Sequence, residues 1–359
     1  MKKINLNSPI GFTGYGVAGL NICKQLVINQ YDVSLFPIGN LNVENQEDGM
    51  LMQNLSSKGD SFDYDATTLK IWHQFDLVNK IGRGKYCAYP FFELDKLKSI
   101  EIHHLNFPDQ IIVSSNWAKN VLLDNGITKP IAIAPLGVNR EIFSPKQEVL
   151  ADKELNNDSY KFIAVGKWEI RKGYDVLCEL FNKAFESSDD VELWILASSH
   201  ESCFSKQELN QWHNYYLSSK LKDKIRIFPR VGSQENVAQI MGNANCGLFL
   251  SRAEGWNLEL LEMMSIGKPV ITTNYSAHTE FVTNENSMLV DIDSTEKAYD
   301  GKWFHGFGNW AKIGKKQEDQ IINYMRQAYK ERINTNDNGM ETANKFSWEN
   351  TIQKIMEVI

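Results

Sequence analysis

The chain has 359 residues, of which 42% are hydrophobic and 23% are charged, so it has ample material for a core and fits two globular domains better than one. Its formal net charge of -7 disfavours a general attraction to nucleic acid or anionic lipid. No apolar run reaches the length of about 18 residues that a transmembrane helix needs, and no long apolar stretch follows Lys2 and Lys3 to form a secretion signal. We therefore expect a cytoplasmic protein and leave open a peripheral position at a membrane.

The cysteines are widely spaced and include no CxxC pair. Such spacing indicates reduced, mostly buried thiols rather than a disulfide framework. No group of cysteines and histidines has the spacing of a zinc site, so the sequence predicts no metal centre. The five cysteines are Cys23, Cys87, Cys178, Cys203 and Cys246.

In the first half of the chain, short apolar runs alternate with longer amphipathic stretches, which is typical of α/β proteins with parallel sheets. A glycine-rich turn at 11–19 and a helix at 20–27 are expected after the first strand. A second helix is expected at 116–124, ended by Gly126. The expected strands are 4–6, 31–36, 69–72, 110–114 and 131–134.

The segment 144–159 carries Pro145 and many charges but little apolar periodicity, so we interpret it as a linker. This interpretation places one Rossmann-like domain at 1–150 and a second at 151–344. The tail 344–359 has the pattern of an amphipathic helix. In the second domain, strands are expected at 162–165, 192–197, 225–228, 246–250 and 269–272.

The segment EGWNLELLEMMSIGKP at 254–269 is the strongest functional signal. A buried strand and a polar turn precede a helix that should begin near Asn257. The amides of Trp256, Asn257 and Leu258 would then lie at a helix N-terminus, where a diphosphate can bind. Glu254 and Glu262 would accept hydrogen bonds from sugar and ribose hydroxyls, although an ordinary helix with solvated acids explains the pattern about as well.

The second signal is GKWEIRKG at 166–173, directly after the first strand of the second domain. Lys167, Arg171 and Lys172 place three cations at the carboxyl end of a strand, the edge at which open α/β sheets bind ligands. Cations there can neutralise the leaving phosphate of a nucleotide. Taken alone, the segment is more readily explained as a solvated basic turn.

The third signal is GFTGYGVAG at 11–19, in which Gly14, Gly16 and Gly19 fit the dinucleotide pattern GxGxxG. That pattern also needs an acid at the end of the second strand, whereas Asp32 precedes this strand. A nicotinamide site is therefore disfavoured, while a close approach of the Gly14–Gly16 backbone to a phosphate or sugar remains an expectation.

Together with residues 111–143, these segments resemble the retaining glycosyltransferases often called family 4, which have the GT-B fold of two Rossmann-like domains facing each other across a cleft. The family pattern G-R-x4-K-G falls on 166–173, with Lys167 in place of the usual arginine, and E-x7-E falls on Glu254 and Glu262. FSWEN at 346–350 is similar to the family's closing helix, so 345–359 is expected to pack on the first domain. The resemblance covers nearly the whole chain.

The resemblance implies transfer of a hexose-type or pentose sugar from a nucleoside-diphosphate sugar to an acceptor hydroxyl, with retention and without an essential metal or other cofactor. It places Lys167 and Lys172 on the diphosphate, Glu262 on the ribose and Glu254 on the sugar. The loss of the arginine fork at Lys167 puts its share of phosphate binding in doubt. The base is expected near Arg230 and Val231, within 230–233. The expected donor-binding residues are Gly14, Tyr15, Gly16, Lys167, Lys172, Arg230, Val231, Glu254, Trp256, Asn257, Leu258 and Glu262.

In the first domain, His73 falls where the family often places a histidine near the donor sugar, and a structural histidine is an equal alternative. We assign Glu254, Lys172 and His73 as catalytic. Glu93, which follows an aromatic stretch, is the candidate on the acceptor side. The aromatic cluster 303–310 is expected to anchor a long loop rather than to bind a sugar.

Other classes of function remain open from the residues alone. A nucleotide-sugar epimerase or a phosphorylase can share the two-domain architecture, and so can a sugar-binding protein without activity. The acceptor is not readable from the sequence; a modified nucleic acid is disfavoured by the acidic net charge but not excluded. The oligomeric state is equally open.

Overall fold

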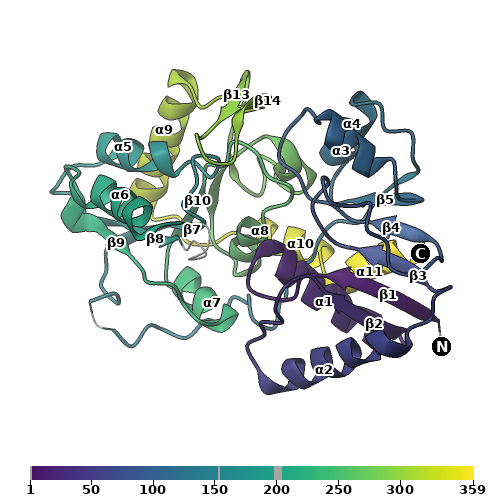
Figure 1. Cartoon of the computed structure of the whole chain (residues 1–359). Coiled ribbons are helices and arrows are strands. Elements are labelled where there is room, and N and C mark those ends of the chain that lie inside the picture. Colours follow the sequence, from purple (N-terminus) through teal and green to yellow (C-terminus); the bar gives the residue numbers. More distant parts are fainter. Residues whose placement is uncertain (1, 153, 198–203) are drawn as a thin grey trace. The chain divides into compact units, whose positions relative to one another are not determined.

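A computed structural model describes residues 2–152, 154–197 and 204–359, and Cys203 lies outside these ranges. The chain forms two compact units, each built on a parallel sheet (Figure 1). The first unit holds residues 1–137 and 346–359, and the second holds 138–345. The expected α/β fold with two Rossmann-like domains is thus confirmed.

The first unit has a six-stranded sheet in the order β2-β1-β3-β4-β5-β6, with all pairings parallel. Helix α1 (Gly14–Ile28) packs against α11 (Trp348–Met356), which joins the C-terminal segment to this unit (Figure 1). The other helices are α2 (Gln46–Ser57), α3 (Ser99–Leu105) and α4 (Asn116–Asp124). The strands are β1 (Lys3–Ser8), β2 (Asp32–Pro37), β3 (Thr67–Lys70), β4 (Tyr86–Ala88), β5 (Gln110–Val113) and β6 (Ile131–Ile133).

The second unit has a six-stranded sheet in the order β12-β11-β10-β7-β8-β9, also parallel throughout. The unit also contains a separate antiparallel hairpin, formed by β13 (Thr295–Tyr299) and β14 (His305–Ala311). The strands are β7 (Tyr160–Gly166), β8 (Val191–Ala197), β9 (Ile225–Ile227), β10 (Cys246–Phe249), β11 (Val270–Thr273) and β12 (Met288–Val290). The helices are α5 (Tyr174–Ala184), α6 (Lys206–Leu217), α7 (Gln234–Gly242), α8 (Leu258–Ser265), α9 (Lys315–Glu331) and α10 (Asp337–Lys345).

Burial explains why these strands form. All seven residues of β8 are buried, as expected for a central strand covered on both faces. Helix α5 buries one apolar face, and α9 packs beside it (Figure 1). The resulting core includes Phe162, Leu193 and Phe181, each without exposed surface.

The expected strands are all present, with small shifts at their ends. The prediction of a glycine-rich turn over 11–19 is wrong, because most of this segment is helical. Helix α1 begins at Gly14, after the N-cap Thr13, whose side chain accepts a hydrogen bond from the Gly16 N–H. A Cβ on Gly16 would lie 2.5 Å from the Gly11 nitrogen. Close packing inside one unit therefore accounts for Gly16.

The boundary between the units falls after Gly137, earlier than the expected position at residue 150. The intervening segment makes its contacts within the second unit. The Ser265 hydroxyl donates to the Phe143 carbonyl at 2.6 Å, and the Leu150 N–H donates to Asn243. These contacts attach 138–150 to the second unit, although its composition resembles a linker.

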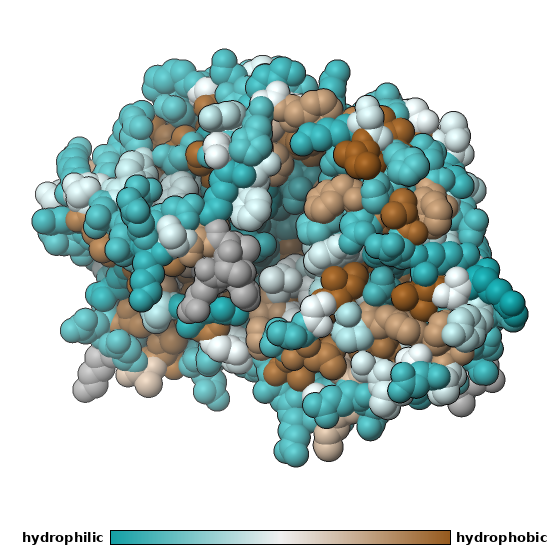
Figure 2. Space-filling model, viewed as in Figure 1, coloured by the Kyte–Doolittle hydropathy of each residue, from teal (hydrophilic) through white to brown (hydrophobic). Residues whose placement is uncertain are grey.

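On the face shown in Figure 2, apolar residues form small patches separated by hydrophilic ones. Large exposed side chains such as Phe12, Leu123 and Tyr299 occur in both units, which is ordinary for a globular protein. Within the described ranges, no helix combines the length and the apolar character that crossing a membrane requires.

Candidate active site

Two turns of the second unit meet because their strands are neighbours. Strands β7 and β10 pair in parallel, so both end at the same edge of the sheet. The turn 167–173 follows β7 and leads into α5, and the segment 250–257 follows β10 and leads into α8. The Arg252 N–H donates to the Arg171 carbonyl at 2.7 Å, which fixes one turn against the other.

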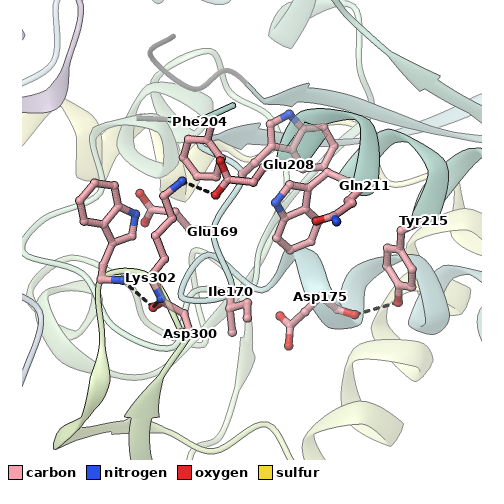
Figure 3. A pocket seen from close by; sticks show the side chains of 13 residues that line it. Glu169, Ile170, Asp175, Phe204, Glu208, Gln211, Tyr215, Asp300 and Lys302 are labelled. Carbon is pink, nitrogen blue, oxygen red and sulfur yellow. Dashed lines mark hydrogen bonds and ion pairs between the residues drawn. The ribbon is translucent and has the colours of Figure 1, made fainter. Parts of the chain in front are cut away.

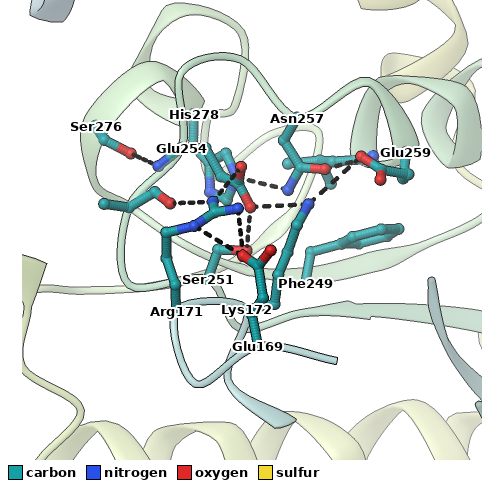
Figure 4. Close-up of polar contacts among 12 residues, drawn as sticks. Glu169, Arg171, Lys172, Phe249, Ser251, Glu254, Asn257, Glu259, Ser276 and His278 are labelled. Atoms are coloured by element: carbon teal, nitrogen blue, oxygen red, sulfur yellow. Dashed lines mark hydrogen bonds and ion pairs between the residues drawn. The ribbon is translucent and has the colours of Figure 1, made fainter. Parts of the chain in front are cut away.

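Glu254 lies at the centre of this contact (Figure 4). Its carboxylate pairs with Lys172 Nζ at 2.9 Å and with Arg171 Nη1 at 2.7 Å, and it accepts a hydrogen bond from the Ser251 hydroxyl at 2.7 Å. Burial opposes the charge, but the two cations outweigh it and hold the pKa of Glu254 well below its usual range. Glu254 is therefore an ionised carboxylate that orients two cations.

Arg171 is a site residue that the sequence did not single out from its cationic neighbours. Its guanidinium, in a side chain only 8% exposed, bridges Glu169 and Glu254 at 2.7 Å each and also donates to the Ala253 carbonyl. The planar fork of arginine suits such a bridge. The approach of Glu254 to Arg171 depends on the pairing of β7 with β10, so no local pattern could reveal it.

Lys172 reaches the first turn of α8. Its ammonium lies 3.5 Å from Glu259, which is in that turn, and its side chain is 8% exposed. Burial works against its charge, but Glu254 and Glu259 outweigh burial and raise the pKa of Lys172. The short path of the turn depends on Gly173, whose φ is +82° and at which a Cβ would lie 2.4 Å from the Leu250 carbonyl oxygen.

Glu262 differs from Glu254 although both are buried. Among the described residues, no hydrogen bond or ion pair engages its carboxyl group. Burial and the nearby Glu259 raise the pKa of Glu262 well above its usual range, while Lys172 acts in the opposite direction. The second acid of the E-x7-E pattern thus offers a hydrogen-bonding group that the protein itself does not use.

The start of α8 is held by a buried histidine (Figure 4). Asn257 has φ of +82° and caps the helix by accepting from the Leu260 N–H, while its amide lies 2.8 Å from His278 Nε2. His278 Nδ1 lies 3.0 Å from the Thr273 carbonyl oxygen, so the proton belongs on Nδ1 and Nε2 accepts from Asn257. Burial lowers the pKa of His278 to about 4, which keeps the ring neutral. No role for His278 could be predicted from the sequence.

The remaining donor candidates of this unit differ in exposure. Lys167 is exposed in the turn after β7, and Arg230 and Val231 lie in the loop between β9 and α7, where Arg230 is exposed. Trp256 and Leu258 are buried beside the Asn257 cap. Both side chains belong to the packing of this turn, so only their backbone groups are placed for a ligand.

In the first unit, the candidates gather around one tyrosine. The ring of Tyr15, in α1, lies 4.6 Å from that of His73, and its hydroxyl donates to the Phe91 carbonyl at 2.8 Å and accepts from the Phe91 N–H at 2.9 Å. Burial raises the pKa of Tyr15 well above its usual value, and Glu93 contributes to the same shift. The structure therefore brings Tyr15, His73 and Glu93 together, with Gly14 at the start of the same helix.

His73 was expected at the end of a strand, but β3 ends at Lys70 and His73 lies in the turn beyond it. Its ring stacks on Phe75 at a centroid distance of 5.0 Å. Within the described residues, no group of acids, cysteines and histidines is arranged to hold a metal ion.

Solved structures share this two-domain architecture over nearly their full length. The chain is 15% identical to sucrose-phosphate synthase from Thermosynechococcus elongatus, with a TM-score of 0.74 and coverage of 100% of this chain and 98% of that one. It is 13% identical to the Anabaena protein HepE in complex with UDP and glucose, with a TM-score of 0.70 and coverage of 99% of each chain. These likenesses establish the GT-B fold.

Residues 145–301 match the model of the family described as glycosyl transferases group 1. The chain is also 23% identical, over 226 residues, to the phosphatidylinositol N-acetylglucosaminyltransferase GPI3 subunit of Saccharomyces cerevisiae (strain YJM789). This alignment covers 60% of the chain and 48% of the relative, so the chain spans about half the length of the curated relatives it matches first. The fold and the family match both support the expected class of enzyme, a glycosyltransferase.

Proposed function

We propose that the chain transfers a hexose-type or pentose sugar from a nucleoside-diphosphate sugar to an acceptor hydroxyl, with retention of configuration, as in the family 4 enzymes it resembles. The observation that carries the proposal is the buried Lys172 ammonium, held by Glu254 at the first turn of α8. A fixed cation beside the N–H groups of a helix start forms an anion site. A nucleoside diphosphate is the leaving group that such a site stabilises.

The neighbouring residues supply the remaining contacts of this proposal. The carboxyl of Glu262, which has no protein partner among the described residues, binds the ribose hydroxyls, and the exposed Lys167 reaches the distal phosphate. Arg230 and Val231 border the base. Two ion pairs and one hydrogen bond already engage the Glu254 carboxylate, which leaves about one of its four acceptor positions for a sugar hydroxyl.

In this proposal the first unit contributes donor contacts through Gly14, Tyr15 and Gly16 and an acceptor contact through Glu93. Gly14 and Gly16 lie at the start of α1, and Tyr15, His73 and Glu93 form a cluster with aromatic and hydrogen-bonding surfaces. His73 approaches the donor sugar, and Glu93 receives the acceptor hydroxyl. No resident cofactor or metal is required for this chemistry, because the charge of the leaving group is met by Lys172 and the amides of α8. The reaction takes place in the cytoplasm.

The test is a panel of UDP-, GDP- and ADP-sugars incubated with the purified chain, with release of the nucleoside diphosphate as the readout. We expect slow hydrolysis of one donor without acceptor and release of the sugar as the anomer present in the donor. Conversion of one nucleotide sugar into another would instead identify an epimerase. If every donor remains unchanged and none binds, the proposal is wrong.

Substitution of Glu262 tests the ribose contact separately. Glu262→Ala should weaken binding of the nucleoside diphosphate about tenfold or more, because hydrogen bonds to the ribose are lost. Glu235→Ala is the matched control, since this acid is exposed in the first turn of α7. Equal affinity of the two variants, measured by calorimetry, would refute the assignment of Glu262.

A further inference from the structure

The second unit contains a cavity outside the candidate active site. It lies beside the turn that carries Arg171, on the side of α6 and the β13–β14 hairpin. Its volume is about 430 Å³, which is within the range of small-molecule sites. Figure 3 shows side chains from α6, from the turn after β7 and from the hairpin directed into one space. The lining residues are Trp168, Glu169, Ile170, Asp175, Phe204, Glu208, Gln211, Trp212, Tyr215, Asp300, Gly301, Lys302 and Trp303.

Aromatic rings form much of this lining. Trp168 and Trp212 stack at a centroid distance of 5.6 Å and an interplanar angle of 21°, which gives a rigid apolar wall. Trp303 lies on the hairpin and remains 50% exposed. A tryptophan with this exposure at the rim of a cavity has a free surface on which the apolar face of a ligand can stack.

The lining also carries four carboxylates and one lysine, so it repels phosphates and other anions. The carboxylates do not call for a cationic ligand either, because the protein compensates each of them. Asp300 accepts hydrogen bonds from the N–H groups of residues 302–304 at 2.7–2.8 Å. The other three form ion pairs at 2.6–2.8 Å: Glu169–Arg171, Asp175–Arg252 and Glu208–Lys302.

A carboxylate that is neutralised in charge still has lone pairs for hydroxyl donors. A pyranose ring has hydroxyls around its rim and C–H groups on its faces, so it needs acceptors and an aromatic surface together. We propose that this cavity binds a neutral sugar ring of a glycan, as a carbohydrate subsite outside the donor site.

Its place in catalysis rests on the proposed function, in which the bound ring belongs to the acceptor glycan. Glu169 connects the two sites, because its carboxylate lines the cavity and pairs with Arg171, the residue that holds Glu254. Carbohydrate binding itself does not depend on transferase activity.

The test measures direct binding of cellotetraose, maltotetraose and mannotetraose to the full chain by saturation-transfer difference NMR, with titrations followed by tryptophan fluorescence. Wild type is compared with Trp303→Ala and with Tyr299→Ala. Tyr299 is an exposed aromatic residue of the same hairpin, 62% accessible, and it is not among the lining residues. Both substitutions are at exposed positions, so both variants should fold.

We expect at least one tetrasaccharide to bind, with the dissociation constant raised about tenfold by Trp303→Ala and unchanged by Tyr299→Ala. The proposal is overturned if no tetrasaccharide binds, or if Trp303→Ala binds as well as Tyr299→Ala. Donor hydrolysis is measured on the same samples. Binding without hydrolysis would refute the transferase proposal alone, and hydrolysis without binding would refute the subsite alone.

Discussion

The candidate residues of the second unit are held by charge, whereas those of the first unit are held by aromatic contacts. Arg171, Lys172 and Glu254 form a buried network in which each charge has an opposite partner. Tyr15 and His73 are in ring contact, and the Tyr15 hydroxyl bonds to the backbone. A network of buried charges fails as a unit when one member is lost, while an aromatic cluster loses one contact at a time.

The largest effect is expected from Arg171→Met, which removes the guanidinium that pairs with Glu169 and one of the two cations that pair with Glu254. The free energy of unfolding should fall by about 3–5 kcal/mol, measured by urea denaturation. The control is Arg83→Met, because Arg83 pairs with Asp65 at the surface, with side chains 77% and 71% exposed, and should leave stability nearly unchanged. If both variants lose the same free energy of unfolding, the buried charge network is no more important for stability than an ion pair at the surface.

Lys172→Met tests whether the same network also serves the chemistry. Turnover of the donor should fall about 10²- to 10³-fold, because a preorganised charge at the leaving group is lost. Lys220→Met is the matched control, since this lysine is exposed and pairs with Glu186 far from α8 in the sequence. Near-normal turnover of Lys172→Met would mean that the lysine only supports the fold.

The dependence of stability on pH distinguishes the contribution of His278 from that of the charged residues around it. The folded pKa of about 4 lies below the ordinary histidine pKa of 6.5, so the unfolded chain takes up a proton that the folded chain excludes. Stability should therefore fall as the pH drops from about 6.5 to about 4, by about 3 kcal/mol in total. Glu262, whose pKa is raised, acts in the opposite direction over part of this range.

The difference between wild type and His278→Gln isolates the histidine, because glutamine is uncharged at every pH of the experiment. The loss of stability between about pH 7 and pH 5 should be smaller in His278→Gln, as measured by denaturant unfolding. His305→Gln, at an exposed position, should behave like wild type. If the free energy of unfolding depends on pH in His278→Gln as it does in wild type, the His278 ring is not neutral and buried as described.

The smallest effect is expected in the first unit. Tyr15→Phe keeps the ring contacts but leaves the backbone N–H and carbonyl of Phe91 without the hydroxyl, so stability should fall by about 1–3 kcal/mol. Tyr64→Phe is the control, because Tyr64 is 62% exposed. A loss as large as that of Arg171→Met would show that the aromatic cluster is as cooperative as the charge network.

The sequence predicted the elements that have strong local patterns. The run at 192–197 is apolar enough to specify a central strand, and Lys172, Glu254 and the start of α8 followed from two motifs whose strands pair. The hairpin was missed because β13 is a polar strand with only Ala298 buried. Its aromatic residues were interpreted as an anchor, which fits the buried Trp310 but not Trp303, which is exposed and lines a cavity.

Contacts between distant segments could not be predicted, because no local sequence pattern encodes them. Arg171 contacts Glu254 because β7 and β10 pair and end at the same edge of the sheet. His278 follows β11 in the chain and contacts Asn257, which precedes α8. The positive φ of Asn257 could not be predicted either, since an asparagine in the sequence does not specify it.

The three glycines of α1 are not equivalent for protein engineering. A Cβ on Gly19 would lie 2.2 Å from the Pro9 carbonyl oxygen, and one on Gly16 would overlap Gly11, whereas nothing lies within 4 Å of a Cβ on Gly14. A library randomised at these positions and selected for folded protein should retain glycine at 16 and 19 but accept many side chains at 14. If Gly14 faces the donor as proposed, diversity at the first helical position is a route to altered ligand preference that leaves the scaffold intact.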